Sequence, residues 1–384
     1  DGTGPWGIIC NGVSYGYVSD AVKELGIADK ISVLRLGFSY PMPPKLIKTF
    51  LHACKRVLVA EEGEPVMEEA VKAFAQEAGL TLSIAGKGEG LFSRLYEFDP
   101  AMVRRVMAGY FGVPHTEGQP PDLSDVPEIP QRPPNLCAGC SHRATFYAVK
   151  KAAEGEETIY PTDIGCYTLG FLPPLAMGDF LICMGSSVST ACGFSKATDK
   201  KVISFIGDST FFHSGMTGLV NAVYNNHNFT LVILDNGTTA MTGHQPNPGV
   251  DMSNFNLSGY GHVSIEAVVR AIGVEHVTVI KPYKVKKSIE AVKAALDHKG
   301  VSVIISQEMC TLYARGLKQL KVRAFTVTDK CKNHRDCINQ IACPAFYLDG
   351  ERVQINPNTC VGCAVCAQIC PENAITPVKA KKAG

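Results

Sequence analysis

Hydrophobic positions along the chain alternate between short continuous apolar runs and longer segments with helical spacing. The first 112 residues contain three apolar runs, at 7–10, 31–36 and 57–60. Between and after them lie three segments with one apolar face each, at 15–25, 44–53 and 65–78. Apolar runs alternating with amphipathic segments predict strands alternating with helices, which favours a parallel α/β sheet.

The same alternation returns after residue 135. Further strands are predicted by the apolar runs at 179–183, 202–206, 229–234, 278–280 and 301–306. Helices are predicted at 141–153, from about 188 onward, at 216–223, at 265–272 and at 287–297. We therefore expect a second doubly wound domain over 135–325.

The segment between these two regions, residues 113–134, contains seven prolines and little apolar periodicity. It predicts an extended linker. The expected organisation is thus an α/β domain at 1–112, a linker at 113–134, a second α/β domain at 135–325 and a small α+β domain at 326–384. A lysine-rich end at 379–382 is expected to be a solvated tail.

Composition narrows the function classes. With 46% hydrophobic and 19% charged residues, the chain can build large cores, and its net charge of +1 gives no reason to propose a nucleic-acid partner. No apolar run reaches the length of a membrane span, and no secretion signal is found. Fifteen cysteines, many in C-x₂-C spacing, favour reduced metal-binding thiolates in the cytoplasm.

Candidate chemistry begins where two predicted strands end. Gly207-Asp208-Ser209 follows one, and Asp235-Asn236-Gly237 follows the next, with 27 residues between Asp208 and Asn236. Each could be an ordinary turn. Parallel strands place both turns at one sheet edge, where a carboxylate, an amide oxygen and a backbone carbonyl suit Mg²⁺ holding a diphosphate. Gly207 permits close backbone approach to the phosphates.

This pair resembles the thiamine diphosphate motif, with Ser209 in place of its last glycine. The continuation LDNGTTAMTGHQPNPG, residues 234–249, is similar to the cofactor domain of 2-oxoacid:ferredoxin oxidoreductases, most closely those of indolepyruvate type. The resemblance implies that Asp208, Asn236 and the carbonyl of Thr238 bind Mg²⁺. It further implies cofactor contacts by Gly207, Ser209, Thr242, Gly243, Met184, Gly185 and Ser186. Four further residues are expected either at the substrate or diphosphate or in structural hydrogen bonds, namely His213, His244, His142 and Arg143.

A first set of cysteines begins with Cys137 and Cys140, which precede a predicted helix. Alone, this spacing fits a metal pair, a redox dithiol or two buried thiols. The family resemblance adds Cys166 and Cys310, and implies that the four thiolates hold a [4Fe–4S] cluster near the thiamine. The remaining thiols are expected to be inert core groups, namely Cys10, Cys54, Cys183 and Cys192.

The strongest local motif is C-x₂-C-x₂-C-x₃-C-P at residues 360–371, the bacterial ferredoxin run; a zinc site is the competing interpretation. The pattern assigns one [4Fe–4S] cluster to Cys360, Cys363, Cys366 and Cys343. A second cluster is assigned to Cys331, Cys337 and Cys370, with His334 as its fourth ligand. That second site could instead hold [3Fe–4S] or an iron with a non-protein ligand.

In the first domain no nucleophile constellation is found. Residues 86–90 predict a flexible Gly-rich loop and residues 61–63 a solvated turn. The domain resembles the transketolase C-terminal-like domain of the same family. The family's preceding pyrimidine-binding domain, with its activating glutamate, has no match in this sequence.

The resemblance implies an anaerobic enzyme that oxidatively decarboxylates an aryl 2-oxoacid of the indolepyruvate or phenylpyruvate type. Electrons would pass through the clusters to ferredoxin, and the acyl group to coenzyme A. A smaller partner subunit is implied, in a heterodimer or a dimer of heterodimers. Three alternatives stay open: another 2-oxoacid such as pyruvate, 2-oxoglutarate or a branched-chain acid; a non-redox thiamine lyase; and a catalytically silent electron-transfer subunit.

Overall fold

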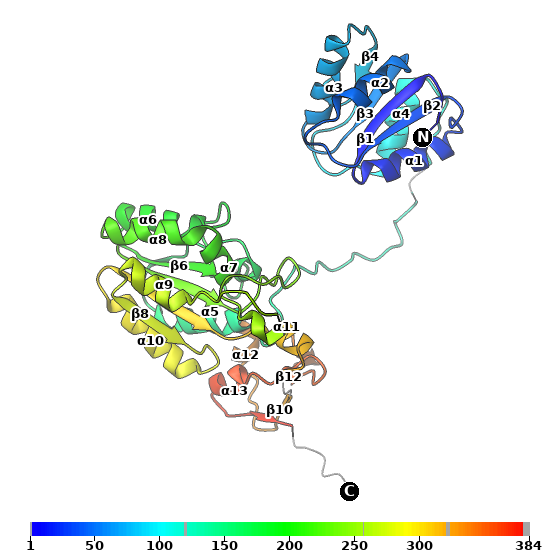
Figure 1. The fold of residues 1–384 in the computed structure, drawn as a ribbon. Helices are drawn as coiled ribbons and strands as arrows, with labels where there is room; N and C mark the ends of the chain where they lie inside the picture. Colours follow the sequence, from blue (N-terminus) through cyan, green and yellow to red (C-terminus); the bar gives the residue numbers. More distant parts are fainter. Residues whose placement is uncertain (1, 119–120, 256, 320–322, 379–384) are drawn as a thin grey trace. The chain divides into compact units, whose positions relative to one another are not determined.

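The computed structural model describes residues 2–118, 121–255, 257–319 and 323–378, so the predicted tail at 379–382 lies outside the described residues. The chain divides into two compact units, Asp1–Ile129 and Pro130–Gly384, called here the first and second unit (Figure 1). The finer domain boundaries expected from sequence stay a prediction. Within the described part of the chain, no helix is both long and apolar enough to cross a membrane.

The first unit is a parallel sheet with helices on both faces. Its strand order is β2 (Ile31–Leu36), β1 (Trp6–Asn11), β3 (Arg56–Ala60), β4 (Ser83–Ala85). Side chains alternate along β1 and β3, so Ile8 and Leu58 face one helix layer while Ile9 and Val57 face the other. These layers are formed by α1 (Ser14–Glu24) with α4 (Pro100–Phe111), and by α2 (Pro44–His52) with α3 (Val66–Glu77).

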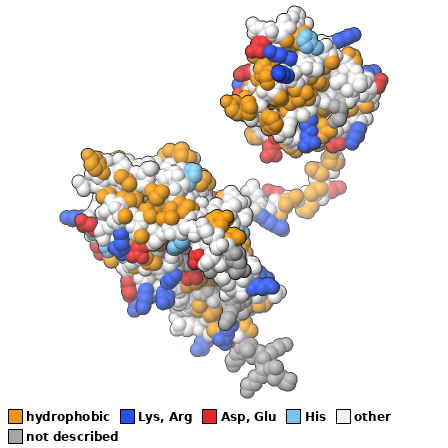
Figure 2. Space-filling model, viewed as in Figure 1, with side chains coloured by type: hydrophobic (Ala, Val, Ile, Leu, Met, Phe, Trp, Pro, Cys, Tyr) orange, Lys and Arg blue, Asp and Glu red, His pale blue; other side chains and the backbone are white. Residues whose placement is uncertain are grey.

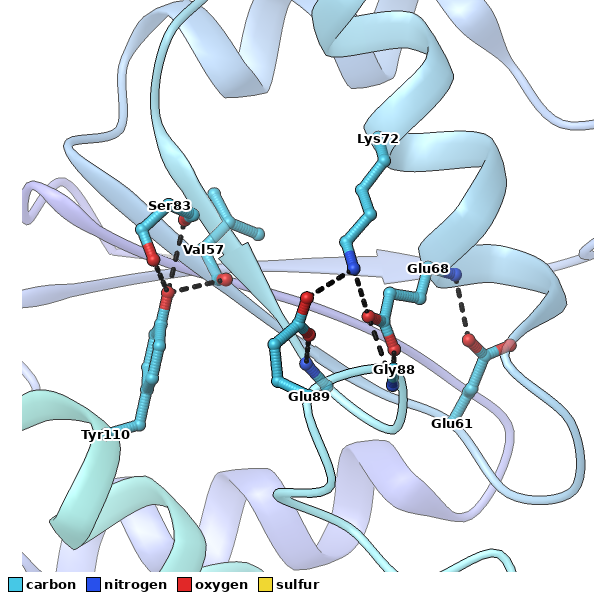
Figure 3. A network of polar contacts seen from close by, with 9 residues as sticks. Val57, Glu61, Glu68, Lys72, Ser83, Gly88, Glu89 and Tyr110 are labelled. Atoms are coloured by element: carbon cyan, nitrogen blue, oxygen red, sulfur yellow. Dashed lines mark hydrogen bonds and ion pairs between the residues drawn. The ribbon is translucent and has the colours of Figure 1, made fainter.

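The carboxyl edge of this sheet carries buried acids, contrary to the sequence prediction (Figure 3). Glu61, only 5% exposed, accepts the backbone N–H groups of Met67 and Glu68, both at 2.8 Å, at the start of α3. Glu68, 1% exposed, accepts from Lys72 Nζ at 2.7 Å and from the N–H of Gly88. The prediction of a solvated turn at 61–63 is therefore wrong at Glu61, because this acid is buried and caps a helix, whereas Glu62 and Gly63 are exposed as predicted. The loop at 86–90 is held by Glu68 through the N–H of Gly88.

The second unit contains a larger doubly wound sheet. Its parallel strands follow the order β5 (Thr158–Ile159), β6 (Lys201–Gly207), β7 (Phe229–Asp235), β9 (Val301–Gln307), β8 (His276–Ile280). One face packs on α5 (Ser141–Ala152) and α10 (Val285–Asp297). The other packs on α6 (Ser186–Ala197), α8 (Met216–Tyr224) and α9 (Ile265–Ile272). The fold class expected from sequence is confirmed.

One predicted strand is wrong. Residues 179–183 form only an isolated bridge, between Pro161 and Phe180, and the following helix begins at Ser186. The apolar side chains of this segment are exposed rather than buried; Ile182 is 62% exposed. Exposure at the surface removes the reason for interpreting an apolar run as a core strand.

The last part of the second unit is a small α+β module, residues 325–378, called here the cysteine-rich module. It contains two antiparallel pairs, β10 (Phe325–Val327) with β13 (Ile375–Pro377) and β11 (Phe346–Asp349) with β12 (Arg352–Ile355). Its short helices are α12 (Asp336–Asn339) and α13 (Val365–Ile369). Cysteines make up much of the interior, in contact with Phe325, Ile355 and Ile375. The module therefore has a small hydrocarbon core, and bound inorganic groups would add to its stability.

Candidate functional site

A cavity of about 510 Å³ opens at the carboxyl edge of β6 and β7. Its lining includes nine predicted site residues: His142, Cys166, Met184, Gly207, Asp208, Ser209, Asn236, Thr238 and Thr242. A Cβ at Gly207 would stand 2.7 Å from the ring of Tyr167, so the tight turn after β6 requires glycine.

Asp208 lies at the start of a continuous helical segment formed by α7 (Asp208–Thr210), one π-helical turn (Phe211–Gly215) and α8. Helix N-termini attract anions such as diphosphate. The carboxylate accepts from the N–H groups of Ser209 at 2.7 Å and Gly237 at 3.0 Å. Burial, and next the charge of Asp235, raise the pKa of Asp208 to about 7. A divalent cation beside this carboxylate would favour its charged form.

The amide of Asn236 connects two sides of the cavity. Its Nδ2 lies 3.4 Å from His142 Nε2, and its Oδ1 accepts from the N–H of Thr238 at 3.2 Å. Burial lowers the pKa of His142 to about 4, so this imidazole is neutral. Thr238 Oγ1 is buried without a hydrogen-bond partner in the described part of the chain. Oxygen donors with an unpaired buried hydroxyl beside them fit a Mg²⁺-bound diphosphate.

The turn at 184–186 is held by a residue that sequence reasoning missed. Asp163, fully buried, accepts from the N–H groups of Ile164, Gly185 and Ser187 at 2.7 to 3.0 Å. The carboxylate thereby joins the segment that carries Cys166 to the turn that carries Met184. The sequence signal for Asp163 is its position three residues before Cys166, in Asp163-Ile164-Gly165-Cys166; the sequence interpretation of this turn assigned a role to Cys166 alone.

The predicted substrate histidines do not line this cavity, and their catalytic roles stay predictions. His213 is exposed, with Nδ1 2.9 Å from Ser214 Oγ, which donates to the carbonyl of Met184. His244 has a positive φ of 65° and its ring stacks on Tyr313 at 5.4 Å.

Of the two roles expected for Arg143, a diphosphate contact or structural hydrogen bonds, the structure shows the second. Its guanidinium donates to the carbonyls of Ile341 and Ala342 in one direction and to Asn135 and the carbonyl of Leu136 in the other. The reason is geometric: the side chain leaves α5 toward the cysteine-rich module, while His142 turns to the cavity.

The first predicted cysteine set comes together beside the cavity. Cys140 immediately precedes α5, Cys310 precedes α11 (Thr311–Gly316), and Cys166 begins a 3₁₀ helix (Cys166–Phe171). Burial, followed by the charges of Cys310 and Cys137, raises the pKa of the Cys166 thiol, so these thiols lie near one another. Cys310 N–H donates to the carbonyl of Asn236 at 3.0 Å, which joins the set to the cavity edge.

The remaining cysteines, with His334, line two separate cavities of the cysteine-rich module, in the two groups expected from sequence. One cavity, of about 320 Å³, is lined by Cys343, Cys360, Cys363 and Cys366. The other, of about 390 Å³, is lined by Cys331, His334, Cys337 and Cys370. His334 Nε2 lies 3.0 Å from Glu372 Oε1.

The donor chemistry of these cavities fits iron–sulfur clusters. Backbone N–H groups already approach two of the sulfurs, Asn333 to Cys331 Sγ at 3.4 Å and Ala374 to Cys370 Sγ at 3.3 Å. Hydrogen bonds to the sulfur ligands help to set the reduction potential of an iron–sulfur cluster. No group of three His, Cys, Asp or Glu side chains suited to one metal ion occurs in the ranges the structure describes. Outside these sets, Cys10 and Cys192 are buried as expected, but Cys183 is exposed, because its segment is not a strand.

Comparison with known proteins agrees with this arrangement. Residues 141–306 match the family described as thiamine pyrophosphate enzyme, C-terminal TPP binding domain, and residues 353–376 match the 4Fe-4S binding domain. The two matches cover the cavity at Asp208 and the C-terminal cysteine run. The chain therefore carries a thiamine diphosphate-binding domain and a 4Fe–4S-binding domain.

Curated relatives extend the match to the whole chain. The indolepyruvate oxidoreductase subunit IorA of Methanothermobacter thermautotrophicus is 46% identical over 97% of this chain and 59% of its own length. That of Archaeoglobus fulgidus is 41% identical over 99% of this chain and 61% of its own length. A solved 2-oxoglutarate:ferredoxin oxidoreductase from Magnetococcus marinus has a TM-score of 0.42 at 21% identity, covering 47% of this chain and 66% of its own, and carries no weight here. The chain is thus a homologue, over nearly its whole length, of the indolepyruvate oxidoreductase subunits IorA, and it spans about three fifths of the length of those relatives.

Proposed function

We propose that this chain is the cofactor-bearing part of a thiamine diphosphate-dependent 2-oxoacid oxidoreductase. Bound thiamine diphosphate would supply an electron sink for decarboxylation, and iron–sulfur clusters would take up electrons one at a time. The single observation that carries the proposal is that Cys166 belongs to both sites. It lines the cavity at Asp208, and it is near enough to Cys310 and Cys137 for their charges to add to burial in raising the pKa of its thiol.

The residues of the cavity have distinct proposed roles. Asp208, Asn236 and the Thr238 carbonyl would hold Mg²⁺, and the helix that begins at Asp208 would bind the diphosphate. His142 would remain neutral and orient the Asn236 amide, because burial lowers its pKa.

The four-iron sites would form a continuous relay. Cys137, Cys140, Cys166 and Cys310 are proposed to hold the cluster nearest the thiamine. Ala138 and Gly139, from the same loop, line the cavity of Cys343, Cys360, Cys363 and Cys366. That cavity would hold the next cluster, and Cys331, His334, Cys337 and Cys370 the last. Because the loop between Cys137 and Cys140 lines the cavity of the second cysteine set, the first two proposed clusters would lie close together.

The substrate is proposed to be an aryl 2-oxoacid, since the similar relatives are named indolepyruvate oxidoreductase subunits. The same names support a smaller partner subunit, and ferredoxin and coenzyme A complete the proposed reaction in the cytoplasm. An exposed apolar surface supports a partner as well. Figure 2 shows hydrophobic side chains over α6 and α8, where Val220 is 52% and Tyr224 84% exposed.

The test is to co-express the full-length subunit with its partner, measure thiamine and iron, and follow viologen reduction with a panel of 2-oxoacids. Indolepyruvate or phenylpyruvate is expected to give the highest kcat/KM, with about 12 iron atoms per subunit for three four-iron clusters. Preference for pyruvate or 2-oxoglutarate would overturn the aryl assignment. Decarboxylation without viologen reduction would overturn the redox proposal itself.

A further inference from the structure

Among the residues the structure describes, one of the largest fully buried side chains is a charged one. Arg143, 2% exposed, lies at the start of α5. No carboxylate forms an ion pair with it among the residues the structure describes. A guanidinium remains charged in proteins, and burying it without an anionic partner is unfavourable. The surroundings must therefore supply negative charge.

The groups around this cation are cysteines of two different sets. Burial lowers the pKa of Arg143, and the neighbouring thiols that oppose this shift are those of Cys343, Cys140, Cys137 and Cys363. Two belong to the set beside the thiamine cavity and two to the cysteine-rich module. Thiolate-ligated iron–sulfur clusters carry net negative charge, and their potentials respond to nearby charge and hydrogen bonds.

The guanidinium also joins the two parts of the second unit. Its Nη1 donates to Ile341 and Ala342 of the cysteine-rich module, and its Nη2 to Leu136 and Asn135 before the C-x₂-C loop. Its Nε, buried, has no hydrogen-bond partner within the described ranges. One N–H donor is thus left over between the two cysteine sets.

The loops that carry these cysteines are packed directly on each other. Gly139, at φ +65°, has no room for a side chain, because a Cβ would stand 1.9 Å from Val361 Cγ2. Tyr283 donates to the carbonyl of Gly139 at 2.6 Å and accepts Gln368 Nε2 at its own carbonyl. A cation fixed here is held by both modules at once.

We infer that Arg143 is the shared countercation of two iron–sulfur clusters, fixing the cysteine-rich module against the thiamine domain and favouring the reduced state of both clusters. The inference rests on the clusters of the proposed function. Arg143 acts through the clusters and touches no substrate, so it is a positioning residue. A fixed positive charge stabilises the added electron and so raises the reduction potential of its neighbours.

The test is an EPR-monitored redox titration of the reconstituted chain, with dithionite as reductant, in wild type, Arg143→Gln and Arg143→Lys. Arg270→Gln, on the exposed face of α9, is the matched control. In Arg143→Gln the two clusters at Cys137/Cys140 and Cys343/Cys363 are expected to shift to lower potential. The third cluster should shift less. Arg143→Lys keeps the charge and should stay near wild type.

Two outcomes would overturn the inference: unshifted potentials in Arg143→Gln at full iron content, or equal shifts in Arg143→Lys and Arg143→Gln. If Arg143→Gln loses iron, retention of iron by Arg143→Lys supports the countercation, and equal loss from both contradicts it. Because the titration needs no 2-oxoacid, failure of the proposed catalytic function would leave it readable.

Discussion

The carboxyl edges of the two parallel sheets carry similar residue types with opposite consequences. In the first unit, Glu61 and Glu68 accept hydrogen bonds from backbone N–H groups and from Lys72, so these acids are paired within the protein itself (Figure 3). In the second unit, Asp208 lines an open cavity beside a Thr238 hydroxyl without a partner. Asp208 also accepts two backbone N–H groups, so the difference lies in the open cavity and in the neighbouring hydroxyl that has no partner among the described residues. A buried acid therefore indicates a ligand site where polar groups beside it are left without partners.

The largest effect is expected from Asp208→Ala. Losing the proposed magnesium ligand should reduce 2-oxoacid-dependent viologen reduction by on the order of 100-fold or more, while iron content stays at the wild-type value. Asp199→Ala, at an exposed position, is the control and should behave as wild type. Full activity in Asp208→Ala would contradict the proposal that the carboxyl edge of the second sheet, unlike that of the first, binds the cofactor.

The cysteine sets are separated by single substitutions. Cys363→Ser is expected to lose about four iron atoms per chain, and Cys331→Ser to damage only the other site of the module. Cys192→Ser, at a buried thiol outside every set, should lose none. Iron analysis with EPR measures this, and equal iron loss from all three variants would contradict the assignment.

In the first unit, Glu68→Ala should act on stability alone. It leaves Lys72 and the Gly88 N–H without their shared acceptor, which should lower the free energy of unfolding by about 2–3 kcal/mol. Urea unfolding measures the loss, with exposed Glu69→Ala as the control. A fall in bound thiamine or iron would show that this edge is also functional.

The smallest effect concerns pH. Burial raises the pKa of Glu61, so the folded protein holds that proton to higher pH than the unfolded chain does. The free energy of unfolding should therefore fall as pH rises from the carboxyl's ordinary value through its raised one. Glu61→Gln should remove this slope and exposed Glu64→Gln should keep it, as followed by urea unfolding at several pH values. The same slope in Glu61→Gln as in wild type would exclude Glu61 as its source.

Much of the fold followed from sequence because its central strands are buried on both faces. Continuous apolar runs such as 202–206 and 229–234 have no other explanation, and their polar ends placed Asp208 and Asn236 together. Strand β4 was not predicted, because a strand of three residues is too short to show a hydrophobic periodicity. The burial of Glu61 and Glu68 was not predicted either, because it depends on hydrogen-bond donors from other segments. The strand predicted at 179–183 is wrong for the opposite reason, because this apolar run lies at the surface and not in the core.

The site was predictable where motif spacing is local and less so where it depends on tertiary contacts. From its spacing alone, the run 360–371 predicted that Cys360, Cys363 and Cys366 lie together, and they line one cavity. The structural role of Arg143 was one of two alternatives, and its partners could not be predicted because Ile341 and Ala342 are almost 200 residues away in the chain. The role of Asp163 could not be predicted, because it accepts three hydrogen bonds from backbone N–H groups, and every residue type except proline carries such a group.

The most direct test of the central claim is calorimetric titration of the chain with thiamine diphosphate, with and without Mg²⁺. We predict one Mg²⁺-dependent site per chain, abolished by Asp208→Ala and unchanged by Glu68→Ala. Absence of binding in the wild-type chain, or equal binding by Asp208→Ala, would contradict the claim that the open edge of the second sheet is the cofactor site.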